Sequence, residues 1–293
     1  MRITQSSIAA SSLANLQASL ARNAQLQEQM TSGKVINRPS DSPTGIVTVM
    51  SMKSQIASST QYSRNASDGA AWLGTVDSTL QTVNERLQRV RDLVLQGSST
   101  GTLDPTSRQA LATEVTSLRG ELMGLANTSY SGRPIFGGTT ANAKAYDDTT
   151  YAYQGNDGQV TRRLDSATTV EVGASGPTVF GDGATSMFKM LDDIATNLVS
   201  NTPALAGNLA QIDGRMNDVL QTLTDVGVRT NRVTAAQTNA DDNVLSMSST
   251  LSGVEDIDLP KTILDMQLSS NAYQAALSAT AKVLQPSLMD FLR

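Results

Sequence analysis

The sequence predicts a mainly α-helical protein in which both chain ends form a long antiparallel coiled-coil helical bundle, with a small inserted β domain at its tip. Two stretches in opposite halves of the 293-residue chain place apolar residues at alternating spacings of three and four, which is the heptad pattern of a coiled coil. The segment between them alternates apolar and polar residues as a strand does. Aromatic residues make up only 4% of the chain, so Leu, Val, Ala and Met must fill a long helical interior.

The two heptad stretches, around residues 62–96 and 205–254, are expected to pair along their length. At about 1.5 Å per residue the first helix would extend for roughly 50 Å, and its apolar stripe is too narrow to be stable alone in water. It therefore needs a partner of matching length, which the second stretch supplies. The expected bundle seam comprises Leu73, Val76, Leu80, Val83, Leu87, Val90 and Val94 from the first stretch and Leu209, Ile212, Met216, Val219, Leu223 and Val226 from the second.

Capping residues and helix breakers delimit the remaining helices. Gly33 is placed to end a first helix in the left-handed conformation, and Pro43 is placed to open the long helix. Asp104 is a candidate N-cap for a third helix, whose leucines keep the heptad spacing and so can pack against the first long helix. Asp258 similarly begins a last helix.

The β domain is expected over residues 130–183, where helical spacing is lost. Six of the ten Tyr and Phe residues fall there, which gives a small separate core the large side chains that it needs. The run Asn156, Asp157 and Gly158 is typical of a hairpin turn. Strands are expected at residues 144–153, 159–164 and 168–172.

Both terminal segments are amphipathic helices that we expect neighbouring subunits to cover. Ordering a residue costs on the order of 1.5 kcal/mol, and each buried apolar side chain returns only about 2 kcal/mol, so the few terminal apolar residues are insufficient alone. The expected domains are 1–43 with 255–293 for assembly, 44–129 with 184–254 for the bundle, and 130–183 for the β domain. The expected assembly residues are Leu13, Leu16, Leu20, Ile263, Met266, Tyr273, Leu277, Leu284, Leu288 and Phe291.

Composition excludes several classes of function. The chain has no Cys and no His, which removes disulfides, the usual zinc ligands, thiol nucleophiles and imidazole-based catalysis. A net charge of -5 argues against binding to nucleic acid, because phosphate binding needs clustered Lys and Arg. No apolar run approaches the roughly 18 to 20 residues that cross a bilayer, and the first residues lack the apolar region of a signal peptide. We therefore expect a structural protein with no cofactor and no membrane partner, not an enzyme.

The acidic residues are candidates for metal ligands or catalytic groups. Glu255, Asp256 and Asp258 could hold a metal ion, but their position just before a helix favours capping and interaction with the helix dipole. The adjacent acidic pairs at 147–148, 192–193 and 241–242 point apart on a helix or strand, so they are expected to be solvated surface groups.

Several motifs resemble the flagellin superfamily, in the right order at both ends of the chain. Residues 63–69 and 87–93 are similar to the two amino-terminal signatures, and residues 255–258 to the carboxy-terminal one; Leu259 and Pro260 depart from the usual pattern. The middle of the chain, at 133–138 and 153–156, resembles the hook–filament junction members more than filament flagellins. The motif residues carried over are Arg64, Asn65, Asp68, Gly69, Arg89, Arg91, Asp256 and Asp258.

The resemblance implies a structural subunit of the bacterial flagellum that joins the hook to the filament through coiled-coil packing of terminal helices between subunits. It further implies an extracellular location after export through the flagellar type III apparatus, without a cleaved signal peptide. Its implied partners are copies of itself, the hook-associated protein on the hook side, flagellin on the filament side, and an export chaperone. Two alternatives stay open: a short filament flagellin, and a soluble coiled-coil binding module.

Overall fold

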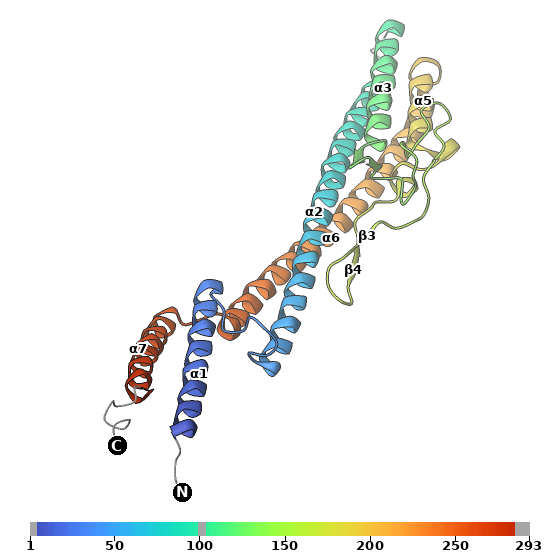
Figure 1. Cartoon of the computed structure of the whole chain (residues 1–293). Helices are drawn as coiled ribbons and strands as arrows, with labels where there is room; N and C mark the ends of the chain where they lie inside the picture. Colours follow the sequence, from blue (N-terminus) through green and yellow to red (C-terminus); the bar gives the residue numbers. More distant parts are fainter. Residues whose placement is uncertain (1–4, 99–103, 285–293) are drawn as a thin grey trace, which may run out of the picture. The chain divides into compact units, whose positions relative to one another are not determined.

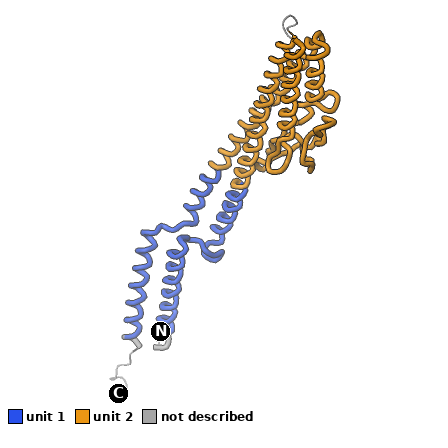
Figure 2. The backbone as a smooth tube through the Cα atoms, turned by 90° about the horizontal axis from the view of Figure 1, so that it is seen from above, with its two compact units in different colours: residues 1–58, 243–293 blue, residues 59–242 orange. Residues whose placement is uncertain are grey.

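The computed structural model describes residues 5–98 and 104–284, and it confirms a mainly helical fold with a small strand region (Figure 1). The helices are α1 (Gln5–Ser32), α2 (Pro43–Ser98), α3 (Pro105–Ala126), α4 (Gly176–Phe180), α5 (Met187–Ser200), α6 (Leu205–Glu255) and α7 (Leu259–Leu284), with 3-10 turns η1 (Gly183–Thr185) and η2 (Thr202–Ala204). The chain divides into two compact units (Figure 2). We call residues 1–58 with 243–293 the terminal unit and residues 59–242 the central unit.

The core of the central unit is the seam between α2 and α6. All seven seam positions on α2 are at most 1% exposed, and on α6 Ile212, Val219 and Val226 are equally buried while Leu209, Met216 and Leu223 pack partly buried against them. The two helices run in opposite directions, and the Arg91 Nε and Asp213 Oδ1 atoms pair across them at 2.7 Å (Figure 1). The heptad residues therefore form a continuous apolar interior along both helices.

Two further helices complete the central unit. Asp104 caps α3 as expected, its Oδ1 atom accepting a hydrogen bond from the Ser107 amide at 2.9 Å. Helix α3 packs closely against α5, whose apolar face is buried through Met187, Phe188, Leu191, Ile194 and Leu198. Arg119 of α3 pairs with Asp192 of α5, so one of the acidic residues expected to be solvated instead lies in an ion pair between helices.

The strand region is smaller than expected and has a different layout. It consists of two antiparallel pairs, β1 (Ser129–Tyr130) with β2 (Arg133–Pro134) and β3 (Thr161–Arg163) with β4 (Thr169–Glu171). The expected strand at 144–153 is wrong, because this segment has only an isolated bridge between Tyr146 and Tyr153. Tyr151 lies at φ 59, and the Asp147 side chain accepts the amides of two residues that follow it, so the backbone turns where a strand would extend.

The predicted position of the hairpin turn is also wrong. Asn156 Oδ1 accepts hydrogen bonds from the amides of Thr139 and Gly158, which ties two loops together instead of joining two strands. The actual turn between β3 and β4 is closed by Asp165 Oδ1, which accepts from the amides of Ala167 and Thr168 at 2.7 and 2.6 Å. The bonds from Gly158 to Asn156 and from Ala167 and Thr168 to Asp165 are local backbone to side-chain bonds typical of Asn and Asp.

The insertion lies along the flank of the helices, not at the tip of the bundle. Arg162 of β3 pairs with Asp68 of α2, and Glu171 of β4 pairs with Arg229 of α6. Asp68 lies roughly 45 Å from the C-terminal end of α2 at about 1.5 Å per residue. The aromatic residues of the insertion also contact Phe188 of α5, so they extend the helical core and do not form a separate one.

In the terminal unit, α1 and α7 form an antiparallel pair. Helix α1 ends at Ser32, and Gly33 follows at φ 72, as the sequence indicated. The Val35 amide donates to the Glu255 carbonyl at 2.7 Å, and the Ile257 amide donates to the Gly33 carbonyl at 3.1 Å. Asn23 Nδ2 donates to the Ser269 carbonyl farther along the pair. The two connections that lead into the terminal helices are thus bonded to each other.

Leu87→Ala tests the seam. Leu87 is fully buried, so truncation should lower the free energy of unfolding of the central unit by about 3 kcal/mol through lost burial and a residual cavity. Urea unfolding followed by circular dichroism measures this. The matched control is Leu220→Ala on α6, whose side chain is 46% exposed and whose loss should cost less than about 1 kcal/mol. Equal costs for the two variants would contradict a continuous seam.

Candidate assembly surface

Exposed apolar side chains are concentrated in the terminal unit. Among the described residues, fifteen large apolar side chains are exposed, and eleven of them belong to this unit although it has the smaller share of the chain. They are Leu13, Leu20, Val35, Val47, Met50, Leu245, Leu259, Ile263, Leu264, Leu268 and Leu277. This concentration makes the terminal unit the candidate surface for binding another molecule.

Helix α7 carries apolar residues on two opposite faces. Met266 and Tyr273 are half-buried on the face that includes Ser269, the residue that accepts the hydrogen bond from α1. Leu264 and Leu268 are 60% and 67% exposed, and at 3.6 residues per turn they lie about half a turn around the helix from Met266. One face therefore packs within the chain, and the other has no partner within the part of the chain that the structure describes.

Some of the residues expected to mediate assembly are exposed, and others are half-buried within the chain. Leu13, Leu20, Ile263 and Leu277 are exposed, whereas Leu16, Met266 and Tyr273 are half-buried. Leu284 ends α7, and its side chain, with Leu288 and Phe291, lies outside the described residues. Leu264 and Leu268 are absent from the residues predicted from the sequence, because only one apolar face was expected on the last helix. Their spacing of four residues was the available signal.

Glu255 is the charged centre of the terminal unit. Its side chain is only 6% exposed, and its Oε1 atom accepts from Lys34 Nζ at 2.9 Å and Lys53 Nζ at 2.7 Å. Burial alone would raise the pKa of Glu255, but the hydrogen bonds and charges of Lys53 and Lys34 outweigh burial and hold the pKa below its ordinary value. We call these three residues the Glu255 triad; it joins α6 to α2 and to the connection after α1.

The neighbouring acids have separate roles. Asp258 Oδ1 accepts from the Lys261 amide at 3.2 Å and so caps α7 as expected, while Asp256 accepts from the Ser252 hydroxyl. Glu255 does not cap the helix, which corrects the sequence interpretation. Within residues 5–98 and 104–284, no group of three or more acidic side chains is arranged to hold a metal ion.

The first motif positions the β3–β4 hairpin against α2. Asp68 Oδ2 accepts from Arg162 Nε at 2.6 Å, and Asn65 Nδ2 donates to the Arg163 carbonyl at 2.9 Å. A Cβ atom on Gly69 would lie 3.3 Å from a methyl group of Val172, so glycine allows the hairpin to approach closely. Arg64 is exposed and makes no ion pair within the described residues.

The second motif joins α2 to its neighbouring helices. Arg89 pairs with Glu114 of α3, and Arg91 pairs with Asp213 of α6. The Asp213 carboxylate accepts a hydrogen bond from Arg91 and raises the pKa of that guanidinium. Arg86 similarly pairs with Glu121 of α3. Arg86, Arg89 and Arg91 therefore each pair with an acidic residue of a neighbouring helix within the central unit.

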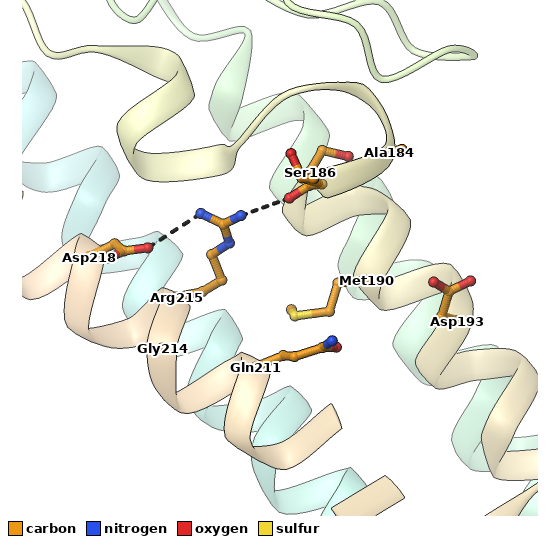
Figure 3. Close-up of a pocket in the computed structure, with 9 residues that line it drawn as sticks. Ala184, Ser186, Met190, Asp193, Gln211, Gly214, Arg215 and Asp218 are labelled. Atoms are coloured by element: carbon orange, nitrogen blue, oxygen red, sulfur yellow. Dashed lines mark hydrogen bonds and ion pairs between the residues drawn. The ribbon is translucent and has the colours of Figure 1, made fainter. Parts of the chain in front are cut away.

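A surface groove between α5 and α6 is bridged by internal contacts (Figure 3). Arg215 lies across it, donating to the Thr185 carbonyl at 2.7 Å and pairing with Asp218 at 3.3 Å. Asp193, on the opposite wall, pairs with Lys189. Each charged side chain that lines this groove already has a partner within the chain, and Arg215 holds the η1 turn to α6.

None of the described helices is long and apolar enough to span a lipid bilayer.

Comparison with known proteins identifies relatives over the whole chain. Residues 3–141 match the bacterial flagellin N-terminal helical region, and residues 209–292 match the bacterial flagellin C-terminal helical region. The flagellar hook-associated protein 3 of Salmonella typhimurium is 27% identical, with 100% of both chains covered. A flagellin of Bacillus subtilis is 26% identical, again over 100% of both. A solved structure of hook-associated protein 3 from Legionella pneumophila shares the fold, with a TM-score of 0.63, 16% identity, and coverage of 70% of this chain and 98% of that one.

Glu255→Gln tests the triad. The two lysines lose their charged partner, so we expect the amide hydrogens of Val35 and Ile257 to exchange faster with solvent. The expected loss of local stability is about 1–3 kcal/mol, and it is limited to this range because the lysines are half exposed. The control is Glu28→Gln, which removes an exposed pair with Arg38 and should change exchange little. Since the folded pKa of Glu255 is depressed, wild-type protection should be present above about pH 4.3 and be lost as the pH falls through the depressed value.

Gly69→Leu tests the position of the hairpin. The larger side chain should displace β3 and β4 from α2, moving Arg162 away from Trp72, whose ring it covers at 5.7 Å. Trp72 is the only tryptophan and is 2% exposed, so displacement should shift its fluorescence emission to longer wavelength. Gly74→Leu is the matched control, because a Cβ atom there has no neighbour within 4 Å. Identical spectra for both variants would show that Gly69 has no such role.

Proposed function

The chain belongs to the bacterial flagellin family, and we propose that it is the structural subunit that joins the flagellar hook to the filament. The observation that carries the proposal is the concentration of exposed apolar side chains in the terminal unit. The central unit has a continuous core and few such residues. The terminal unit therefore has apolar surface to bury when neighbouring subunits cover it.

Assembly accounts for the exposed leucines on the terminal helices. Each exposed leucine on α1 or α7 gains about 2 kcal/mol when a neighbour buries it fully, so contacts repeated between subunits would stabilise helices that are marginal alone. We propose residues 1–43 and 255–293 as the assembly segments and the flanking insertion as the outward part of the subunit. The proposed partners are further copies of the chain, the adjoining hook-associated protein and flagellin.

Export fits the same proposal. We propose that the chain leaves the cell through the flagellar type III apparatus, accompanied by an export chaperone and without cleavage of a signal peptide, and that it acts outside the cell. Its role there is structural, through packing between subunits, and involves no catalysis and no cofactor.

A deletion strain tests the function. Without this protein, cells should carry bare hooks and release flagellin into the medium, because filament subunits have nothing to attach to. Electron microscopy and immunoblots of culture supernatants measure both. A short filament flagellin predicts a different result, in which filaments persist, and that outcome would replace the proposal.

Within that strain, Leu13→Ser, Leu20→Ser and Leu277→Ser combined should be exported yet fail to restore filaments, since about 2 kcal/mol of burial is lost at each site. The matched control combines Leu220→Ser and Val228→Ser, which are exposed in the central unit and should leave filaments intact. Circular-dichroism melts of purified variants should coincide with the wild type. A control that fails while the terminal variant succeeds would place the assembly surface elsewhere.

A further inference from the structure

Methionine supplies all the sulfur chemistry of this protein, because the chain has eleven methionines and no cysteine. Met1 and Met289 lie outside the described residues. Among the described residues, Met50 of α2 is the only exposed methionine, at 66%. At the other extreme, Met187 is fully buried and Met190 is 9% exposed. An oxidant dissolved in water therefore meets the Met50 side chain most readily.

Two further methionines line a groove between α2 and α6 in the terminal unit. The groove has a volume of about 390 Å³. Met52 of α2 and Met247 of α6 lie on its walls, and both are half-buried. Hydrogen peroxide is little larger than water, so a groove of this volume admits it to the side chains that line it.

The other walls of this groove are polar and suit the product of methionine oxidation. Thr48, Ser51, Ser246 and Thr250 place hydroxyl groups beside the two methionines. Ser51 Oγ accepts a hydrogen bond from Gln55 Nε2 at 3.2 Å, which leaves the hydroxyl proton of Ser51 available to a new acceptor. A sulfoxide oxygen is such an acceptor. A sulfoxide that is hydrogen-bonded avoids the cost of a buried unsatisfied polar group.

We propose that Met50, Met52 and Met247 are sites of oxidation by hydrogen peroxide and related peroxides, and that their sulfoxides make the surface of the terminal unit more polar without unfolding it. In each reaction the lone pair of Sδ attacks one peroxide oxygen. The O–O bond breaks as the S–O bond forms, and the sulfur is oxidised by two electrons. The other oxygen leaves as hydroxide and takes the proton of the transferred oxygen, giving water. Reduction of the sulfoxide requires a methionine sulfoxide reductase.

Oxidation changes the surface on which exposed apolar side chains are concentrated. Val47 and Met50 are three positions apart on α2, so they are neighbours on the helix surface, and they are 67% and 66% exposed. A sulfoxide at Met50 converts part of this surface from apolar to polar. The consequence for assembly rests on the proposed function, under which neighbouring subunits cover the terminal unit. Peroxide then reduces the fraction of subunits that can assemble.

A time course with purified protein tests the order of oxidation. The full chain is treated with hydrogen peroxide, and fragment-ion mass spectrometry follows each methionine separately. Met50 should be oxidised first, and Met52 and Met247 should follow. All three should react at least about fivefold faster than Met190, which lines the groove between α5 and α6 but is only 9% exposed. The circular-dichroism melt should stay unchanged while these three sites are oxidised.

Met216 of α6 is the matched control in this time course. It is half-buried against the core of the central unit and does not line the groove of Met52 and Met247. If Met216 is oxidised as fast as these two, the groove does not direct peroxide to them. If the melting temperature falls as they are oxidised, the fold does not tolerate the sulfoxides. Either result overturns the proposal, as does a Met50 that reacts no faster than Met190.

Substitution in the deletion strain tests the consequence for assembly. Met50→Gln, Met52→Gln and Met247→Gln combined place an amide oxygen where the sulfoxide oxygen would lie. This variant should be exported and should melt as the wild type does, yet it should reduce the fraction of cells bearing filaments by about fivefold or more. Met50→Leu, Met52→Leu and Met247→Leu combined keep the surface apolar and should restore filaments as the wild-type gene does.

The outcomes of the substitutions separate the proposal from the proposed function. Full restoration by the glutamine variant, or failure of the leucine variant, would show that polarity at these three positions does not control assembly. A lowered melt of the glutamine variant would contradict a fold that tolerates the sulfoxides. A wild-type gene that fails to restore filaments would instead remove the proposed function, while the order of oxidation in purified protein would be unaffected.

Discussion

The fold depends on one constraint, which is that the apolar stripe of α2 must be covered along its length. A 56-residue helix with buried residues at heptad spacing has no means of removing that stripe from water by itself. Helix α6 supplies the cover from the opposite half of the chain, and α3 and α5 pack beside them. Because the partner comes from the other half, the chain must return on itself, and both terminal helices consequently belong to the same compact unit.

Ion pairs then determine how the β3–β4 hairpin and the connections of the terminal unit are positioned against the long helices. Asp68 of α2 pairs with Arg162 of the hairpin, and Arg229 of α6 pairs with Glu171 of the hairpin. In the terminal unit, Glu255 pairs with two lysines. Apolar packing along a long helix leaves sliding and rotation weakly specified, because one heptad resembles the next. Directional charged contacts at a few sites select one arrangement. With only 17% charged residues, the chain has few competing pairs.

The parts of the structure that depend on local periodicity could be predicted from the sequence. The parts whose position depends on contacts between distant segments could not. Seam positions such as Leu80 and Val219 follow from helical spacing, and Gly33 and Asp104 end or begin helices through local backbone chemistry. The flank position of the insertion could not be predicted, since it depends on pairs such as Asp68 with Arg162, separated by 94 positions. The second apolar face of α7 was missed because a single stripe already satisfied the pattern.

The two units differ in what completes them. In the central unit the apolar stripes of α2 and α6 face each other, so intramolecular packing satisfies them and the surface keeps only scattered apolar residues. In the terminal unit, as far as the described residues extend, α1 and α7 pack one face each against the other and leave the opposite face exposed. Full intramolecular burial there would leave no surface for neighbours, and full exposure would leave α7 without a defined position. A helix pair that buries only one face of each helix avoids both, because the internal contacts fix the direction of the exposed face, which under the proposed function is the face for a second subunit.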